Sequence, residues 1–200
     1  MFAKFHQATV RRPARLGYAG VVNSAPNRPA IALVPLCVDH VDHIMTWVND
    51  PAVVGNLASF AGSAFTREQE VRWIESVTAS SAEVVFSVFN PVDNSYLGQV
   101  GLHQIHHRSK VARLAVIIAN RGNMGRGYGS AAVDAMLGHG FVSMDLHKIW
   151  LMVFTANTRS RGIYGRLGFC EEGTLREEYF HDGGWHDMTR MAVLQRDWLR

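Results

Sequence analysis

The sequence predicts an α/β fold in which a central mixed β-sheet of about seven strands carries helices on both faces. Three observations favour this fold. Short apolar runs typical of buried strands alternate with segments whose apolar residues recur at helical spacing. One such run, Leu114–Ala119, enters a glycine-rich turn that is followed at once by a helical pattern. The last two runs are joined by His181-Asp182-Gly183-Gly184, and Asp-Gly-Gly is a hairpin signal.

Each expected strand has a local signal of its own. Apolar or alternating runs predict seven strands, at residues 30–36, 84–89, 96–105, 114–119, 148–154, 171–180 and 185–194. No internal repeat or composition change divides them. We therefore predict one domain, over residues 29–200, preceded by an arm at residues 1–28 that lacks strand or helix periodicity.

The helices are predicted from their caps. Asp39 is expected to cap a helix that runs to about Asn49, and Thr66 with Gln69 fits a capping box that opens the next helix. Residues 52–65 between them are expected to form a loop. A third helix follows the glycine turn, and a fourth spans Thr158 to Leu167 and stops at Gly168. We interpret Trp47 and Trp73, in the first two helical segments, as core residues.

Charge is divided unevenly along the chain. Residues 1–38 hold five basic residues and no acidic residue, whereas the whole chain carries only +3, so the remainder carries −2. A nucleic-acid footprint should lie on a folded basic face, so we expect no nucleic-acid partner. The arm is read as a flexible basic segment, although a transit peptide has a similar composition. It folds back on the domain or on the partner subunit of a homodimer; the sequence leaves both open.

Several other classes of protein are disfavoured by composition. Uncharged stretches are short or broken by Gly and Pro, so we expect no membrane span. Cys37 and Cys170 fit neither a disulfide framework nor a metal-ligand spacing, which favours a reducing cytoplasm. The His103, His106 and His107 cluster has no second ligand group at a recognised spacing, and we expect no metal site.

The glycine turn has the features of an anion-binding site. A strand, a glycine-rich turn and a helix N-terminus place free N–H groups and the positive end of the helix dipole at one point. Arg126 adds a full positive charge. The turn lacks the Lys-Ser/Thr ending of a nucleotide triphosphate loop and the glycine spacing of a dinucleotide fold, so a different phosphate-bearing ligand is expected.

About thirty residues later comes a second motif, Asn157-Thr158-Arg159-Ser160-Arg161-Gly162-Ile163-Tyr164-Gly165-Arg166-Leu167-Gly168-Phe169. The two motifs together resemble those of the GNAT superfamily of N-acetyltransferases, and Trp47-Val48-Asn49-Asp50-Pro51 resembles its RimJ/RimL-like branch. The resemblance implies a sheet with a splayed cofactor-binding strand pair and acetyl-CoA as co-substrate. It also implies a set of cofactor-binding residues: Ile117, Ile118, Ala119, Met124, Gly125, Arg126, Gly127, Gly129, Ser130 and Asn157.

Tyr164 is the general acid that the resemblance implies, since a phenol is protonated at neutral pH and can donate to a departing thiolate. The base is open. Relatives often carry Ala-Glu where this chain has Ala112-Arg113, and the candidates that remain are His103, Glu83, His181 and Asp187.

The expected function is acetyl transfer to the primary amine of a small molecule, by direct transfer in a ternary complex. A protein N-terminal amine is the near alternative, and a non-catalytic acyl-CoA-binding module is the other class. We expect the loop 52–65 and the hairpin 181–184 to line the acceptor pocket.

Overall fold

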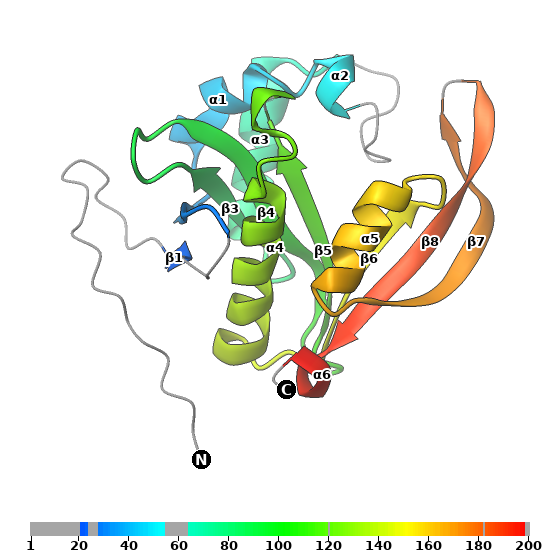
Figure 1. The fold of residues 1–200 in the computed structure, drawn as a ribbon. Helices are drawn as coiled ribbons and strands as arrows, with labels where there is room; N and C mark the ends of the chain where they lie inside the picture. The colour runs from blue at the N-terminus through cyan, green and yellow to red at the C-terminus, as the bar shows by residue number, and fades with distance from the viewer. Residues whose placement is uncertain (1–20, 24–27, 55–63, 120, 182, 199–200) are drawn as a thin grey trace.

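The structure is a computed structural model that describes residues 21–23, 28–54, 64–119, 121–181 and 183–198. One sheet organises it, with strand order β1-β2-β3-β4-β5-β6-β8-β7 (Figure 1). Its strands are β1 (Val21–Asn23), β2 (Ile31–Pro35), β3 (Val84–Phe89), β4 (Tyr96–His106), β5 (Val111–Ile118), β6 (Lys148–Phe154), β7 (Cys170–His181) and β8 (Gly184–Leu194). The α/β class and all seven expected strands are confirmed. The additional strand, β1, lies inside the expected arm and pairs with β2.

The helical elements follow the caps, with one correction. They are η1 (Val38–His40), α1 (Val41–Met45), α2 (Pro51–Val54), α3 (Arg67–Ala79), η3 (Arg121–Asn123), α4 (Tyr128–Gly138), the π-helical turn η4 (His139–Ser143), α5 (Thr158–Arg166) and α6 (Gln195–Trp198). The capping box is confirmed, because Thr66 and Gln69 each accept the other's backbone N–H. Gly168 ends α5 with φ of +93°, as expected.

The expected helix from Asp39 to Asn49 is wrong. Asp39 lies inside the η1 turn, and its side chain caps nothing there. Helix α1 ends at Met45, four residues before Asn49, whose side chain forms two hydrogen bonds to the backbone of Phe65, of 2.7 and 2.9 Å. Pro51 then starts α2, which extends into the segment expected to be a loop, residues 52–65. Residues 55–63 of that loop lie outside the described residues.

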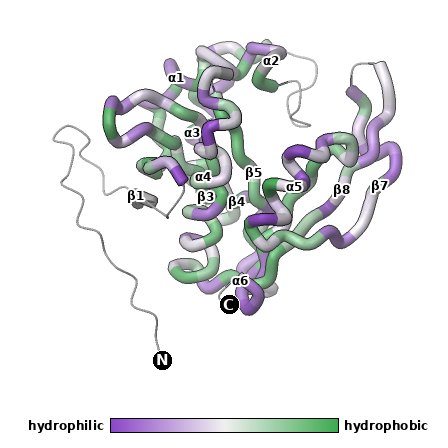
Figure 2. Tube along the Cα trace, viewed as in Figure 1, coloured by the Kyte–Doolittle hydropathy of each residue, from purple (hydrophilic) through white to green (hydrophobic). Residues whose placement is uncertain are grey.

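Helices cover both faces of the sheet. Successive side chains of a strand point to opposite faces, so neighbouring strand residues pack beneath different helices. Val116 of β5 packs into the core beneath α4, whereas its neighbour Ile117 packs beneath α1 and α3. Figure 2 shows apolar residues concentrated along α4 and the central strands and polar ones along β7. None of the described helices is long and apolar enough to cross a membrane.

The strand pair β5 and β6 separates along its length. The two strands are parallel and pair only over Val111–Arg113 and Lys148–Trp150. Beyond Arg113, β5 continues to Ile118 beside β4 alone, and β6 continues to Phe154 beside β8 alone. The splayed strand pair is therefore present, and it opens toward the glycine turn.

Candidate active site

A groove lies between β5 and β6 on the side of α4 and α5. Two adjoining cavities form it, of about 310 and 870 Å³, and they share the C-terminal part of β5 and the start of α5. We call it the β5–β6 groove. The residues that line it include the expected catalytic residue, Tyr164, and many expected to bind the cofactor: Ile117, Ile118, Met124, Gly125, Gly127, Gly129, Ser130 and Asn157.

The open edge of β5 supplies backbone groups to this groove. The N–H of Ala119 donates to the carbonyl of Leu97 on β4, at 2.8 Å. Backbone groups of successive strand residues point to alternate sides, so Ile117 and Ala119 are turned toward β4, and Val116 and Ile118 toward the gap. Of the three expected strand contacts, the geometry thus favours Ile118 alone, and it adds Val116, which sequence reasoning missed.

The glycine turn has the backbone geometry of an anion site. Gly125 and Gly127 have φ of +81° and +88°, in the left-handed region that favours glycine. Gly127 is the N-cap of α4, and its carbonyl accepts the first helical bond, from Ala131. The N–H groups of the first helical turn therefore face the groove without intrahelical acceptors.

Positive charge gathers around this turn from a second element. Arg126 is exposed in the turn itself. Arg159 of α5 reaches it, since its terminal nitrogen lies 2.9 Å from where a Cβ on Gly125 would stand. Arg166 also lines the groove. Sequence reasoning missed both α5 arginines, although their spacing of seven residues places them on one helical face.

Asn157 and Tyr164 are held at the groove by α5. The side-chain oxygen of Asn157 caps the helix by accepting the N–H of Ser160 at 3.0 Å, which leaves its amide NH₂ as the group for a ligand. Tyr164 packs edge-on against Phe169, with ring centroids 5.8 Å apart. Burial raises the pKa of Tyr164 to about 12, so its hydroxyl keeps its proton at neutral pH.

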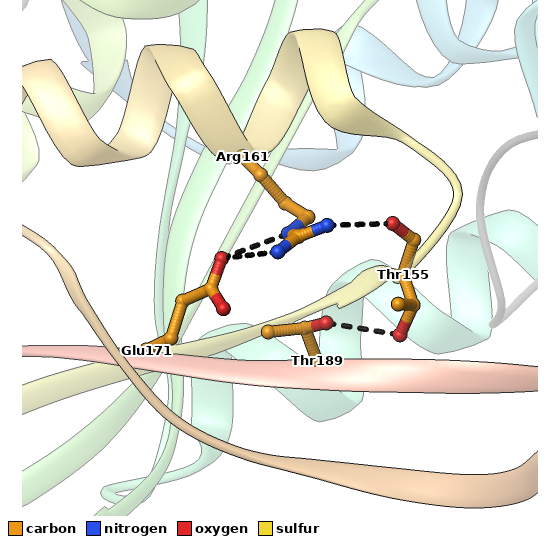
Figure 3. A network of polar contacts seen from close by, with 4 residues as sticks. All are labelled: Thr155, Arg161, Glu171 and Thr189. Carbon is orange, nitrogen blue, oxygen red and sulfur yellow. Dashed lines mark hydrogen bonds and ion pairs between the residues drawn. The ribbon is translucent and has the colours of Figure 1, made fainter.

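A polar network fixes α5 against the sheet (Figure 3). Arg161 donates to the Glu171 carboxylate of β7 at 2.6 and 2.9 Å and to the carbonyl of Thr155 at 2.9 Å. The Thr155 hydroxyl is 2.9 Å from that of Thr189 on β8. This network ties the start of α5 to the strands beneath it, and so positions Asn157 and Tyr164.

A further cavity, separate from the groove and of about 390 Å³, lies on the opposite face of β5 beneath α3. We call it the α3 cavity. Its walls are largely aromatic, from Trp47, Phe65 and Trp73, and its floor includes Gly101 and Ala115. Trp47 is therefore both a core residue, as expected, and a wall of the cavity; Trp73 is only partly buried. The two sites meet at β5, because Arg113, Ala115 and Ile117 line both.

Two unpaired polar side chains face the α3 cavity. Glu70 of α3 is 5% exposed, and within the described part of the chain no hydrogen bond or ion pair to its carboxylate is found. Burial alone raises the pKa of this carboxyl group. The amide nitrogen of Gln99 is also buried without a partner among the described residues. Because an uncompensated buried carboxylate is costly, the cavity suits a cationic ligand.

The four candidate bases are placed in three different regions. His103 lines the α3 cavity, and its Nδ1 contacts Glu83, the residue before β3. His181 lines the β5–β6 groove instead, near the glycine turn. The Asp187 carboxylate accepts the backbone N–H of Glu177 at 2.8 Å, which is a structural role within the β7–β8 hairpin. Of the two segments expected to line the acceptor pocket, the loop contributes Phe65 to the α3 cavity, and the hairpin contributes His181 to the groove. Within the described residues no group of His, Cys, Asp or Glu side chains is arranged to hold a metal ion.

Comparison with known proteins gives consistent matches. The family model for the acetyltransferase (GNAT) domain matches residues 30–170. A spermidine N(1)-acetyltransferase of Vibrio cholerae is 33% identical over 112 residues, which are 56% of this chain and 64% of the relative. A putative ribosomal N-acetyltransferase of Bacillus subtilis, YdaF, is 28% identical over 53% of this chain and 57% of the relative. These matches span less than two thirds of the relatives' own length.

Solved structures extend the match over most of the chain. The spermidine N-acetyltransferase from Vibrio cholerae in complex with CoA and spermine superposes with a TM-score of 0.79 at 25% identity. The superposition covers 85% of this chain and 98% of that one.

Proposed function

Because the chain belongs to the GNAT acetyltransferase domain family, we propose that it is an acetyl-CoA-dependent N-acetyltransferase that acts on a small-molecule amine. The observation that carries the proposal is the shared strand. β5 lines the groove that suits a phosphate-bearing thioester on one face and the cavity that suits a cation on the other. Both ligands would then meet at the strand, as direct transfer in a ternary complex requires.

The residues of the groove fit acetyl-CoA. The N–H groups at the start of α4, together with Arg126 and Arg159, would provide the positive charge that a negatively charged pyrophosphate needs. Val116 and Ile118 offer backbone groups to an extended pantetheine arm, which would add to the open edge of β5 like another strand. Tyr164 lies in the inner part of the groove and would protonate the thiolate as it leaves.

Within small amines, a diamine or polyamine is the specific proposal. Glu70 would pair with one ammonium group, and Trp47 and Trp73 would flank it, since aromatic faces attract cations. The names of relatives that act on spermidine support the same class. The alternative acceptor is the N-terminal amine of a protein. Among these observations, only the match to YdaF supports it.

Thiol release from acetyl-CoA across a panel of amines tests this function. The panel should contain an alkyl monoamine without a second charged group, a diamine, spermidine and a peptide with a free N-terminus. We expect kcat/KM to be highest for the diamine or spermidine. Preference for the peptide would support the N-terminal alternative. If acetyl-CoA binds by calorimetry but no amine releases thiol, the chain is an acyl-CoA-binding module and the proposal is wrong.

A further inference from the structure

His103 and Glu83 form a pair at one end of the α3 cavity. The imidazole Nδ1 of His103, on β4, contacts the carboxylate Oε2 of Glu83, just before β3. Their side chains are only 19% and 24% exposed. His103 and Glu83 lie on the face of the sheet opposite Tyr164 and the groove, so nothing described for the groove explains why the two side chains are paired.

The pair lies beside the point where the two ligand sites meet. In the register of β4 and β5, His103 is directly opposite Arg113. Arg113 is also the last residue of β5 that pairs with β6, and it lines both the groove and the α3 cavity. Opposed residues on antiparallel strands share a face, so the imidazole reaches the cavity next to the splay of the sheet.

The contact with Glu83 selects one tautomer of the imidazole. A carboxylate accepts, so Nδ1 carries the proton and Nε2 keeps a lone pair. Nε2 extends over the cavity floor, where a Cβ on Gly101 would stand 2.9 Å from it. A third group, Glu70 of α3, lines the same cavity. Burial lowers the pKa of His103 and Arg113 lowers it further, while Glu83 opposes both effects.

We infer that His103 is the general base of the transfer reaction and that Glu83 is its positioning residue. The inference rests on the proposed function. His103 lies directly across from Arg113, which lines both the groove and the α3 cavity, so its imidazole lies where the acceptor amine would approach the thioester.

The proton balance of the step is complete. Nε2 of His103 takes one proton from the substrate ammonium, directly or through one water, and Glu83 stabilises the imidazolium. The freed amine attacks the thioester carbonyl, a C–N bond forms, and the C–S bond breaks. Tyr164 gives its proton to the thiolate, and the proton lost from the new amide nitrogen restores the phenol. His103 then releases its proton to solvent, so one proton is released per turnover.

The test compares acceptors of high and low pKa in wild type and His103→Gln. With a cationic amine near neutral pH, we expect kcat to fall roughly 10²-fold in the variant while acetyl-CoA affinity is unchanged by calorimetry. With an acceptor such as a hydrazide, which is already neutral at this pH, the loss should be less than about threefold, because no base is needed. An equal loss for both acceptors would indicate a structural role and overturn the inference.

The pH profile gives a second, independent readout. The wild-type acid limb of kcat/KM should lie below the ordinary pKa of 6.5. Glu83→Gln removes the anion that raises the pKa of His103, so its acid limb should move to lower pH still. His147 is an exposed histidine just before β6, so His147→Gln is the matched control and should keep the wild-type profile. If the acid limb does not move in Glu83→Gln, the inference is overturned, but turnover by the wild type would still support the proposed function. Absence of turnover in wild type overturns both.

Discussion

The β5–β6 groove and the α3 cavity lie on opposite faces of one strand, yet they are built in different ways. The groove uses backbone: left-handed glycines, free N–H groups at a helix start and the open edge of β5. The α3 cavity uses residues from six separate parts of the chain: the turn after α1, the segment before α3, α3 itself, β3, β4 and β5. Backbone sites need a few special residues close together in sequence, whereas side-chain sites depend on how distant segments pack. The difference predicts which substitutions affect which ligand.

The groove should be most sensitive at Gly127. Gly127→Glu places a side chain where φ is +88° and adds a charge that repels pyrophosphate. We expect acetyl-CoA affinity to fall about a hundredfold, or about 2.7 kcal/mol, by calorimetry. Gly127→Ala carries the backbone strain without the charge and should lose less. Gly173→Glu on β7, where a Cβ meets nothing within 4 Å, is the control. Unchanged affinity in folded Gly127→Glu would remove the anion site from the turn.

Tyr164→Phe should separate binding from chemistry within the same groove. The ring and its packing on Phe169 remain, but the proton donor is lost. Turnover should fall roughly 10²-fold with acetyl-CoA affinity unchanged. Since burial raises the pKa of Tyr164 to about 12, the wild-type phenol stays protonated at every pH below that value. Any alkaline limb at lower pH therefore belongs to another group, and full turnover in the variant would assign the acid elsewhere.

Glu70→Gln should affect the α3 cavity and leave the groove unchanged. We expect KM for a cationic acceptor to rise about tenfold, because a charge-assisted contact is lost. Acetyl-CoA affinity should not change. Glu68→Gln, which alters an exposed carboxylate in the same helical turn, is the control. If KM is unchanged for diamines and polyamines alike, Glu70 does not bind the acceptor.

The same substitution should stabilise the ligand-free protein. Burial raises the pKa of Glu70 in the folded state, so below its ordinary pKa this group costs no stability. As pH rises through the raised value, folding must bury a charge, and stability is lost. Glu70→Gln removes that loss. We expect a melting temperature higher by a few degrees at neutral pH, where about 1 kcal/mol corresponds to roughly 2–4 °C, and no gain at acidic pH.

This contrast also explains how far the sequence leads. The strands, the glycine turn and the cap of α3 follow from local patterns, and Tyr164 and Asn157 follow from one motif. The helix expected from Asp39 to Asn49 is shorter in the structure, Val41–Met45, and the bonds of Asn49 to Phe65 join residues far apart in sequence, which no local pattern predicts. Glu70 had a signal that was not used: it shares the buried face of α3 with Ile74 and Val77, at positions i, i+4 and i+7. A carboxylate among apolar residues at helical spacing indicates a buried site.

The smallest effect is expected at the N-terminus, where neither ligand site is lined by described residues before Trp47. Removing residues 1–20 takes four basic residues and changes the net charge from +3 to −1. Acetyl-CoA affinity, acceptor KM and melting temperature should stay close to wild type. Removing residues 1–28 also takes β1 from the edge of the sheet and Arg28 from its 2.5 Å ion pair with Asp134 of α4.

The longer deletion should therefore lower the melting temperature by a few degrees while acetyl-CoA still binds. A partly exposed ion pair contributes about 0.2–1 kcal/mol, and an edge strand of three residues adds little more. Comparing the two truncations by thermal melting and light scattering locates the boundary of the domain. Equal destabilisation by both would assign a structural role to residues 1–20. A change in oligomeric state, or in acceptor KM, would instead show that the arm contacts a partner subunit or the acceptor cavity.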